Sequence, residues 1–165
     1  VGNGVLGRLV ARLARAQGAH PTVWEIAESR REGEGEEVVH PEADARKDYQ
    51  SAVDVSGDPE IIDVLSPRLA RGGQVVLAGF YAEPVSFQFP MMFMKEASVR
   101  ISSEWKPDDL TAALQFIQTD PSILDGLITH RRTVEAAAEA YATAFEDPSC
   151  LKMLLDWRAI EGTST

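Results

Sequence analysis

The sequence predicts an α/β fold, a doubly wound and mainly parallel sheet of six strands with helices on both faces. Three observations support this prediction. Segments with the apolar periods of helices and of strands alternate along the 165 residues. The chain opens on G-x-G-x-x-G, residues 2–7, which runs directly into a helical pattern. Runs such as residues 74–79 are almost continuously apolar, as in parallel strands that are covered on both faces.

The opening glycines predict a loop that binds a pyrophosphate. Gly2 would allow a tight turn after a strand, Gly4 would let the phosphates approach the backbone, and Gly7 would let the helix pack closely on the sheet. The phosphates would then lie at the helix N-terminus, next to Val5 and Leu6. Methyltransferases that use S-adenosylmethionine have similar glycine loops, so the motif alone leaves both classes open.

The motif requires a strand in front of it, and only Val1 stands there. We therefore expect the natural chain to continue upstream, with the first strand largely missing from this segment. The hydrophobic content of 44% suits one globular domain. We expect a single dinucleotide-binding domain over residues 1–158 and a loose tail over residues 159–165.

Composition excludes several classes of protein. The net charge of −10, with no concentrated basic face, argues against nucleic-acid binding. Cys150 is the single cysteine, so no internal disulfide can form, which fits a reducing cytoplasm. The three histidines show no zinc-ligand spacing, and no metal site is predicted. No apolar run approaches the length of a membrane span.

Glu25 follows the glycine loop at the distance expected of a ribose-binding acid, near the end of a β-prone run. Its carboxylate would accept hydrogen bonds from the adenosine ribose and repel the extra phosphate of NADP, which favours NAD. Arg30 and Arg31 complicate this prediction, because arginines just beyond that strand can hold the NADP phosphate. The alternative is that all three residues are solvated charges in a polar stretch.

The other elements are predicted from periodicity and from Gly and Pro positions. The first predicted elements are a helix over 5–17, a strand over 22–26, a small strand within an otherwise mobile, charged stretch over 28–48, and a strand over 52–57. A helix from 58 through Leu69 follows, which Gly72 and Gly73 stop, and then strands over 74–79 and 95–103. The last elements are a helix over 107–118, a loop over 125–132, a helix over 134–145 and a strand over 151–155.

Two of these strands end at the sheet edge where open α/β folds bind ligands. We expect Ser56 to lie at the end of the first and Gly79, Phe80 and Tyr81 at the end of the second, near the nicotinamide half of the cofactor. Tyr81 could donate a proton there, or serve as packing or binding surface. The nearby run 87–94 is rich in Phe and Met. It suits core, a subunit interface or contact with a large flat apolar ligand.

In these features the chain resembles the cofactor-binding half of the medium-chain alcohol dehydrogenase family. The resemblance extends over nearly the whole chain and rests on the opening motif with Glu25 and on residues 53–57, 71–79, 127–131, 138–145 and 151–152. It implies NAD as cofactor and hydride transfer to its nicotinamide. It places Lys152 near the pyrophosphate, with a solvent-facing strand lysine as the alternative, and treats His130 and Arg131 as loop structure first.

The same resemblance implies a homodimer paired through the edge strand near Ala97–Ser103. In this family the substrate domain comes first and carries the catalytic proton relay and, in many members, zinc. No catalytic residue is therefore expected within this segment. Residues 77–87 and 144–153 are similar to members that oxidise the hydroxyethyl side chain of a bacteriochlorophyllide a precursor to acetyl. That similarity implies a hydroxyethyl chlorin as substrate; the alternatives are another medium-chain dehydrogenase or a methyltransferase-like domain.

Overall fold

The structure, a computed structural model, describes residues 1–31 and 37–158. It divides into two compact units, Val1–Pro107 and Asp108–Thr165, and each is described by itself. The expected mobile surface falls partly on residues 32–36 and the expected tail on residues 159–165, which lie outside the described residues. The single domain expected over residues 1–158 stays a prediction.

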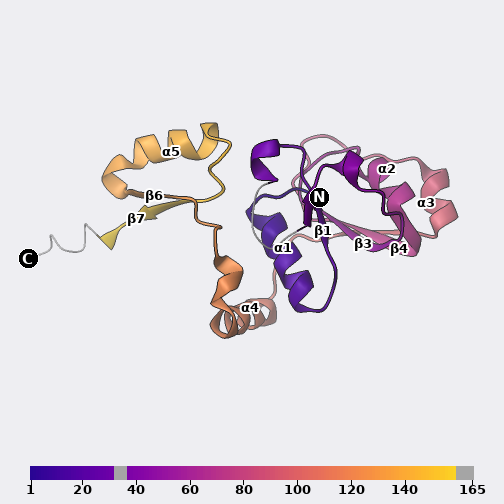
Figure 1. Ribbon diagram of the computed structural model, residues 1–165, viewed down its shortest axis with the longest axis horizontal. Coiled ribbons are helices and arrows are strands. Elements are labelled where there is room, and N and C mark those ends of the chain that lie inside the picture. Colours follow the sequence, from indigo (N-terminus) through magenta and orange to yellow (C-terminus); the bar gives the residue numbers. More distant parts are fainter. Residues whose placement is uncertain (32–36, 159–165) are drawn as a thin grey trace, which may run out of the picture. The chain divides into compact units, whose positions relative to one another are not determined.

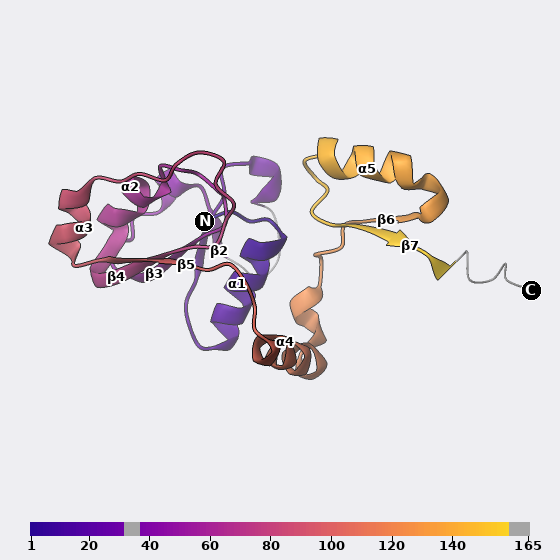
Figure 2. The same ribbon diagram turned by 180° about the vertical axis from the view of Figure 1, so that it is seen from behind.

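The first unit contains the strands around the glycine loop (Figures 1 and 2). Strand β1 (Thr22–Trp24) pairs with β2 (Glu37–Val39). Strand β3 (Tyr49–Asp54) pairs with β4 (Leu69–Leu77), and β4 pairs on its other side with β5 (Ser98–Ile101). All of these pairs are parallel, which confirms the predicted class of sheet.

Val1 and Gly2 join the two groups of strands. The amino group of Val1 donates to the carbonyl oxygen of Val53 at 2.6 Å, and its carbonyl accepts from the N–H of Val55 at 3.0 Å. On the other side, the N–H of Gly2 donates to the carbonyl of Trp24 at 2.8 Å. The order β2-β1-(residues 1–2)-β3-β4-β5 thus matches the 3-2-1-4-5-6 order of a doubly wound sheet. The exact number of strands stays a prediction.

Helices cover both faces of these strands. Helix α1 (Val5–Ala16) lies on one side of them and α2 (Ile61–Leu65) on the other in both views (Figures 1 and 2). Helix α3 (Phe89–Lys95) precedes β5. The buried core joins α2, α3, β1 and β4 through Trp24, Ile61, Ile62, Leu65, Leu69, Val75, Leu77 and Met92.

The helix predicted through Leu69 is shorter than expected. It ends at Leu65, and a 3₁₀ turn over Ser66–Arg68 follows it. Pro67 in this turn has no N–H to continue a helical hydrogen-bond ladder. Leu69 begins β4 instead, and the expected stop at Gly72-Gly73 lies inside that strand.

The second unit contains two helices and a pair of strands. Helix α4 (Pro107–Thr119) begins at its boundary, and α5 (Ala137–Glu146) connects β6 (His130–Thr133) to β7 (Met153–Asp156). The two strands pair in parallel. The loop predicted over residues 125–132 is therefore partly wrong, because its last residues join β6. Their charged, non-alternating side chains hid a strand that is held by backbone pairing with β7.

Short 3₁₀ helices complete the described residues at Glu28–Arg30, Pro41–Ala43, Ser66–Arg68, Pro121–Leu124 and Val134–Ala136. None of the helices in this part of the chain is long and apolar enough to cross a membrane.

Candidate dinucleotide-binding site

The glycine loop leads from Val1 and Gly2, which join the two groups of strands, into α1, and its geometry depends on Gly2 and Gly7. Gly2 has a φ of +91°, a backbone conformation that residues with a Cβ rarely adopt. A Cβ on Gly7 would lie 1.8 Å from the carbonyl oxygen of Gly2, so any side chain would force α1 away from the loop. Gly4 caps α1, and a Cβ there would meet no atom within 4 Å. The loop is therefore tightly packed at Gly7 and open at Gly4.

Glu25 follows β1 directly and lies beside this loop. Its side chain is only 8% exposed. One carboxylate oxygen accepts from the backbone N–H of Asn3 at 3.0 Å, and the other accepts from the N–H of Ala27 at 2.9 Å. Each oxygen has a second lone pair, so the carboxylate retains capacity for further donors. The solvated-charge alternative does not describe Glu25 in this structure.

Asn3 is a part of this site that the sequence did not indicate. It is 2% exposed, and its Nδ2 donates to the carbonyl oxygen of Arg30 at 2.6 Å. Its Oδ1 is buried and accepts no hydrogen bond within the described residues. A buried acceptor without a donor is costly, so this atom fits a ligand that brings a hydroxyl or N–H group.

Of the two arginines beyond β1, Arg31 has its guanidinium held by backbone carbonyls at and next to Glu25. The guanidinium of Arg31 donates to the carbonyl oxygens of Glu25 at 3.3 Å and Ile26 at 2.6 Å. The carbonyl of Arg30 receives the Asn3 hydrogen bond described above. Arg31 thus already uses guanidinium donors on the chain's own carbonyls.

The loops after β3 and β4 continue the site from the glycine loop along the sheet edge. A Cβ on Gly2 would lie 3.3 Å from Val55 and 3.5 Å from the backbone N of Ser56. A Cβ on Gly57 would lie 2.4 Å from the carbonyl oxygen of Phe80, and one on Gly79 would lie 2.9 Å from the N of Gly57. The three loops form one row of close backbone contacts, from Gly2 through Gly57 to Phe80.

Asp54, the last residue of β3, is a buried carboxylate at the centre of this row. It accepts hydrogen bonds from the hydroxyl of Ser56 at 2.6 Å and from the hydroxyl of Tyr81 at 2.5 Å. Burial raises the pKa of Tyr81 strongly, and the hydrogen bond to Asp54 and the negative charge of Asp54 raise it further. The phenol is thus a poor proton donor to a substrate, since its proton is held by a carboxylate. A charged residue inside the apolar run 52–57 was the available sequence clue to Asp54.

The remaining predicted site residues lie in different surroundings. Val5 and Leu6 occupy the first turn of α1, where Leu6 is 49% exposed. Phe80 is 94% exposed beside Gly79. Lys152 belongs to the second unit, where its exposed side chain precedes β7 and its carbonyl accepts from the N–H of His130 at 3.2 Å.

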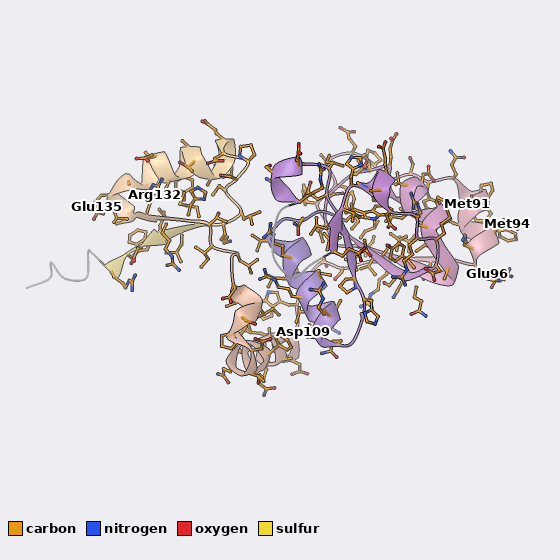
Figure 3. The ribbon with its side chains drawn as sticks, in the orientation of Figure 1. Met91, Met94, Glu96, Asp109, Arg132 and Glu135 are labelled. Carbon is orange, nitrogen blue, oxygen red and sulfur yellow. The ribbon has the colours of Figure 1, made fainter. Side chains whose placement is uncertain are left out.

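The Phe- and Met-rich run forms α3 and lies largely on the surface of the first unit. Phe89, Phe93 and Met94 are each about two-thirds exposed, and only Met92 is buried. Figure 3 shows Met91 and Met94 on α3. The core interpretation is therefore wrong for most of this run. Helix formation itself was not expected there.

No cluster of three or more His, Cys, Asp or Glu side chains that could hold a metal occurs in residues 1–31 and 37–158.

Comparison with known proteins relates this chain to dehydrogenases. The chain is 58% identical, over 161 residues, to 2-desacetyl-2-hydroxyethyl bacteriochlorophyllide A dehydrogenase of Cereibacter sphaeroides, covering 96% of this chain and 51% of the relative. It is 56% identical to the protein of the same name from Rhodobacter capsulatus, with the same coverage of both chains. The chain is related to the medium-chain alcohol dehydrogenases. The expected resemblance is thus confirmed.

The chain spans about half the length of the curated relatives it matches, and it covers their C-terminal half. No protein-family model matches it.

Solved structures show the same fold. The structure aligns with a protein described as a short chain alcohol dehydrogenase (rspB) from E. coli CFT073, complexed with NADH, at a TM-score of 0.78 and 18% identity, covering 94% of this chain and 50% of that chain. It aligns with S. aureus TarJ in complex with NADPH at a TM-score of 0.82 and 18% identity, covering 94% and 53%. These likenesses confirm the Rossmann type of fold.

Proposed function

We propose that this chain is the NAD-binding half of a dehydrogenase that oxidises the hydroxyethyl side chain of a bacteriochlorophyllide a precursor to an acetyl group. The observation that carries the proposal is the continuous row at one sheet edge, from Glu25 and Asn3 through the glycine loop to Gly57 and Phe80. A dinucleotide has two nucleoside ends joined by a pyrophosphate. Such a row offers buried polar groups for one nucleoside, an open helix N-terminus for the pyrophosphate, and the loops after β3 and β4 for the other nucleoside.

The adenosine end would lie at Glu25. Its carboxylate and the unpaired Oδ1 of Asn3 are both acceptors, which suits the two hydroxyl donors of a ribose. A phosphate on that ribose would instead meet the negative charge of Glu25, while Arg31 is engaged by backbone carbonyls. This arrangement supports NAD over NADP. The pyrophosphate would lie at Gly4, with Val5 and Leu6 supplying backbone N–H groups. A role for Lys152 in holding the pyrophosphate stays an expectation from the family resemblance.

The nicotinamide end would lie at the loops with Ser56, Gly79, Phe80 and Tyr81. When bound, NAD supplies the hydride acceptor. The residues of this chain would hold and orient it. From the family resemblance we expect the proton relay and any catalytic zinc in the substrate domain, which this chain does not contain. The substrate proposal rests on the activity for which the two relatives are named, since this chain is 58% and 56% identical to them. A reducing cytoplasmic location is part of the same proposal.

The partner we propose is a second copy of the chain, paired along β5. All four residues of β5 are exposed, and no described strand pairs with its outer edge. Val99 of β5 lines the same surface hollow as Phe89 and Phe93 of α3. An exposed apolar edge strand favours association. An Ile101→Lys variant would put like charges at a two-fold edge and should shift sedimentation to the monomer, whereas Val64→Lys on α2 should not; a dimer in both variants would contradict this interface.

Calorimetric titration of the full-length protein with NADH, NADPH and S-adenosylmethionine tests the cofactor. We expect NADH to bind most tightly. Replacing Glu25 by Gln removes its charge while keeping one oxygen. NADH affinity should fall about tenfold, the value of hydrogen bonds to a charged group, and NADPH affinity should fall less or rise. Glu28→Gln is the matched control, because Glu28 is an exposed acid three residues away.

The outcomes separate the alternatives. Tighter binding of S-adenosylmethionine than of NADH would exclude the dehydrogenase proposal in favour of the methyltransferase class. Equal losses of NADH and NADPH in Glu25→Gln would mean that Glu25 does not contact the ribose. Turnover of the full-length protein with the hydroxyethyl bacteriochlorophyllide and NAD tests the substrate, and an active protein that forms no acetyl product would remove this substrate while leaving the class.

A further inference from the structure

Asp54 is the hydrogen-bond acceptor on which both loops at the nicotinamide end converge. It is fully buried, with an exposed fraction of 0%. Its Oδ1 accepts from the hydroxyl and N–H of Ser56 at 2.6 and 3.2 Å. Its Oδ2 accepts from the N–H of Gly57 at 3.3 Å and from the hydroxyl of Tyr81 at 2.5 Å. Four donors, three from the loop after β3 and one from the loop after β4, therefore meet one carboxylate.

The contribution of Tyr81 differs from the other three because it comes from a separate loop. Ser56 and Gly57 lie two and three residues from Asp54 and stabilise their own turn. Tyr81 lies 27 residues away, and its ring packs against the buried core. Its hydroxyl is the side-chain tie between the loop after β4 and the end of β3.

This hydrogen bond lies where the loop after β3 and the loop after β4 approach each other closely. The carbonyl oxygen of Phe80 lies 2.4 Å from the position of a Cβ on Gly57. The loop after β4 thus lies close against Gly57, and the hydrogen bond of Tyr81 to Asp54 opposes movement of this loop away from it. The hydrogen bond thereby helps to hold the backbone of Gly79 and Phe80 against Gly57, in the loop after β3.

We propose that Tyr81 and Asp54 are a positioning pair that holds the loop of Gly79 and Phe80 in place for the nicotinamide half of the cofactor. The inference rests on the proposed function, because it assigns the nicotinamide to this end of the row. Tyr81 acts through the loop and contacts no reacting atom. The raised pKa of Tyr81 agrees with a phenol that keeps its proton and uses it to donate a hydrogen bond to Asp54.

Binding of NADH and of ADP-ribose to full-length Tyr81→Phe tests the pair. ADP-ribose contains the adenosine, the pyrophosphate and the second ribose but no nicotinamide. Removal of the hydroxyl should weaken NADH binding about tenfold while changing ADP-ribose binding less than about twofold, since only the loop at the nicotinamide end is released. The fluorescence of bound NADH should also shift toward that of the free cofactor.

Tyr49→Phe is the matched control. Tyr49 also donates its hydroxyl to an aspartate, Asp44 at 2.7 Å, but it begins β3 rather than following β4. This variant should bind both ligands as the unchanged protein does. Equal losses of NADH and ADP-ribose in Tyr81→Phe, or no loss of either, would overturn the positioning role. Failure of the unchanged protein to bind either ligand would instead overturn the proposed function itself.

Discussion

Strand β3 has a tyrosine–aspartate hydrogen bond at each of its ends, and the two pairs differ in surroundings. At its start, Tyr49 donates to Asp44, which is half-buried and also accepts from the indole N–H of Trp24 at 2.7 Å. At its end, Asp54 is fully buried and accepts from Tyr81. The chemistry of the two pairs is the same.

The difference lies in what each pair connects. The Asp44 pair ties the segment before β3 to β1, which is part of the sheet itself, and Arg68 donates to the carbonyl of Asp44 from another element. The Asp54 pair ties together two loops at the carboxyl edge, where such sheets bind ligands. Changes at the first end should therefore alter stability alone, while changes at the second should alter stability and cofactor binding together.

The largest effect is expected from Gly57→Ala at the carboxyl end. Gly57 has a φ of +81°, and the new methyl group would lie 2.4 Å from the carbonyl oxygen of Phe80. Strain and overpacking together should lower the free energy of unfolding by about 2–4 kcal/mol. The two loops must separate to relieve the contact, so NADH binding should fall as well. Thermal unfolding and calorimetry on the full-length protein measure both effects.

Gly18→Ala separates the strain from the clash. Gly18 follows α1 with a similar φ of +83°, but a Cβ there would meet no atom within 4 Å. This control should cost only about 1 kcal/mol and leave NADH binding unchanged. If Gly57→Ala were no more destabilising than Gly18→Ala, and bound NADH normally, the two ends of β3 would not differ in the way described.

Much of this site follows from local sequence. The glycine spacing and Glu25 indicated the loop, the first helix and the acid, because each depends on backbone geometry that few residue types allow. The parallel strands were predicted from their apolar runs. The parallel pairs β1–β2, β3–β4 and β4–β5 confirm this prediction.

The parts that were missed depend on contacts between distant residues. Tyr81 and Asp54 are 27 residues apart, and nothing local shows that their side chains meet. The orphaned Oδ1 of Asn3 likewise depends on burial by the segment after β1. His130–Thr133 is a strand because β7 pairs with it. Leu69 belongs to β4 and not to the predicted helix, which ends before the turn that contains Pro67. Tertiary pairing overrode the local pattern at His130–Thr133, whereas at Leu69 the effect of Pro67 on the preceding helix was missed.

A smaller effect, confined to stability, is expected at the other end from Asp44→Asn. Burial acts to raise the pKa of Asp44, but the hydrogen bonds from Tyr49, from the N–H of Arg46 and from Trp24, together with the charge of Arg68, lower it overall. The ionised form is thus favoured by folding. The variant should lose about 1–2 kcal/mol of unfolding free energy at pH 7, the value of weakened hydrogen bonds to a charged acceptor, with NADH affinity unchanged.

The sign of the pH dependence follows from the lowered pKa. Asp44 contributes its stability above the carboxyl pKa of the unfolded chain, about 3.9, and loses it as the pH falls through the lower pKa of the folded state. The stability difference between the unchanged protein and Asp44→Asn, measured by denaturant unfolding, should therefore shrink below about pH 4. Asp48→Asn, which alters an exposed carboxylate that pairs with Arg46, should change stability by less than about 0.5 kcal/mol. A loss of NADH affinity in Asp44→Asn would mean that the start of β3 also shapes the cofactor site, because a change confined to the sheet's own packing leaves the carboxyl edge intact.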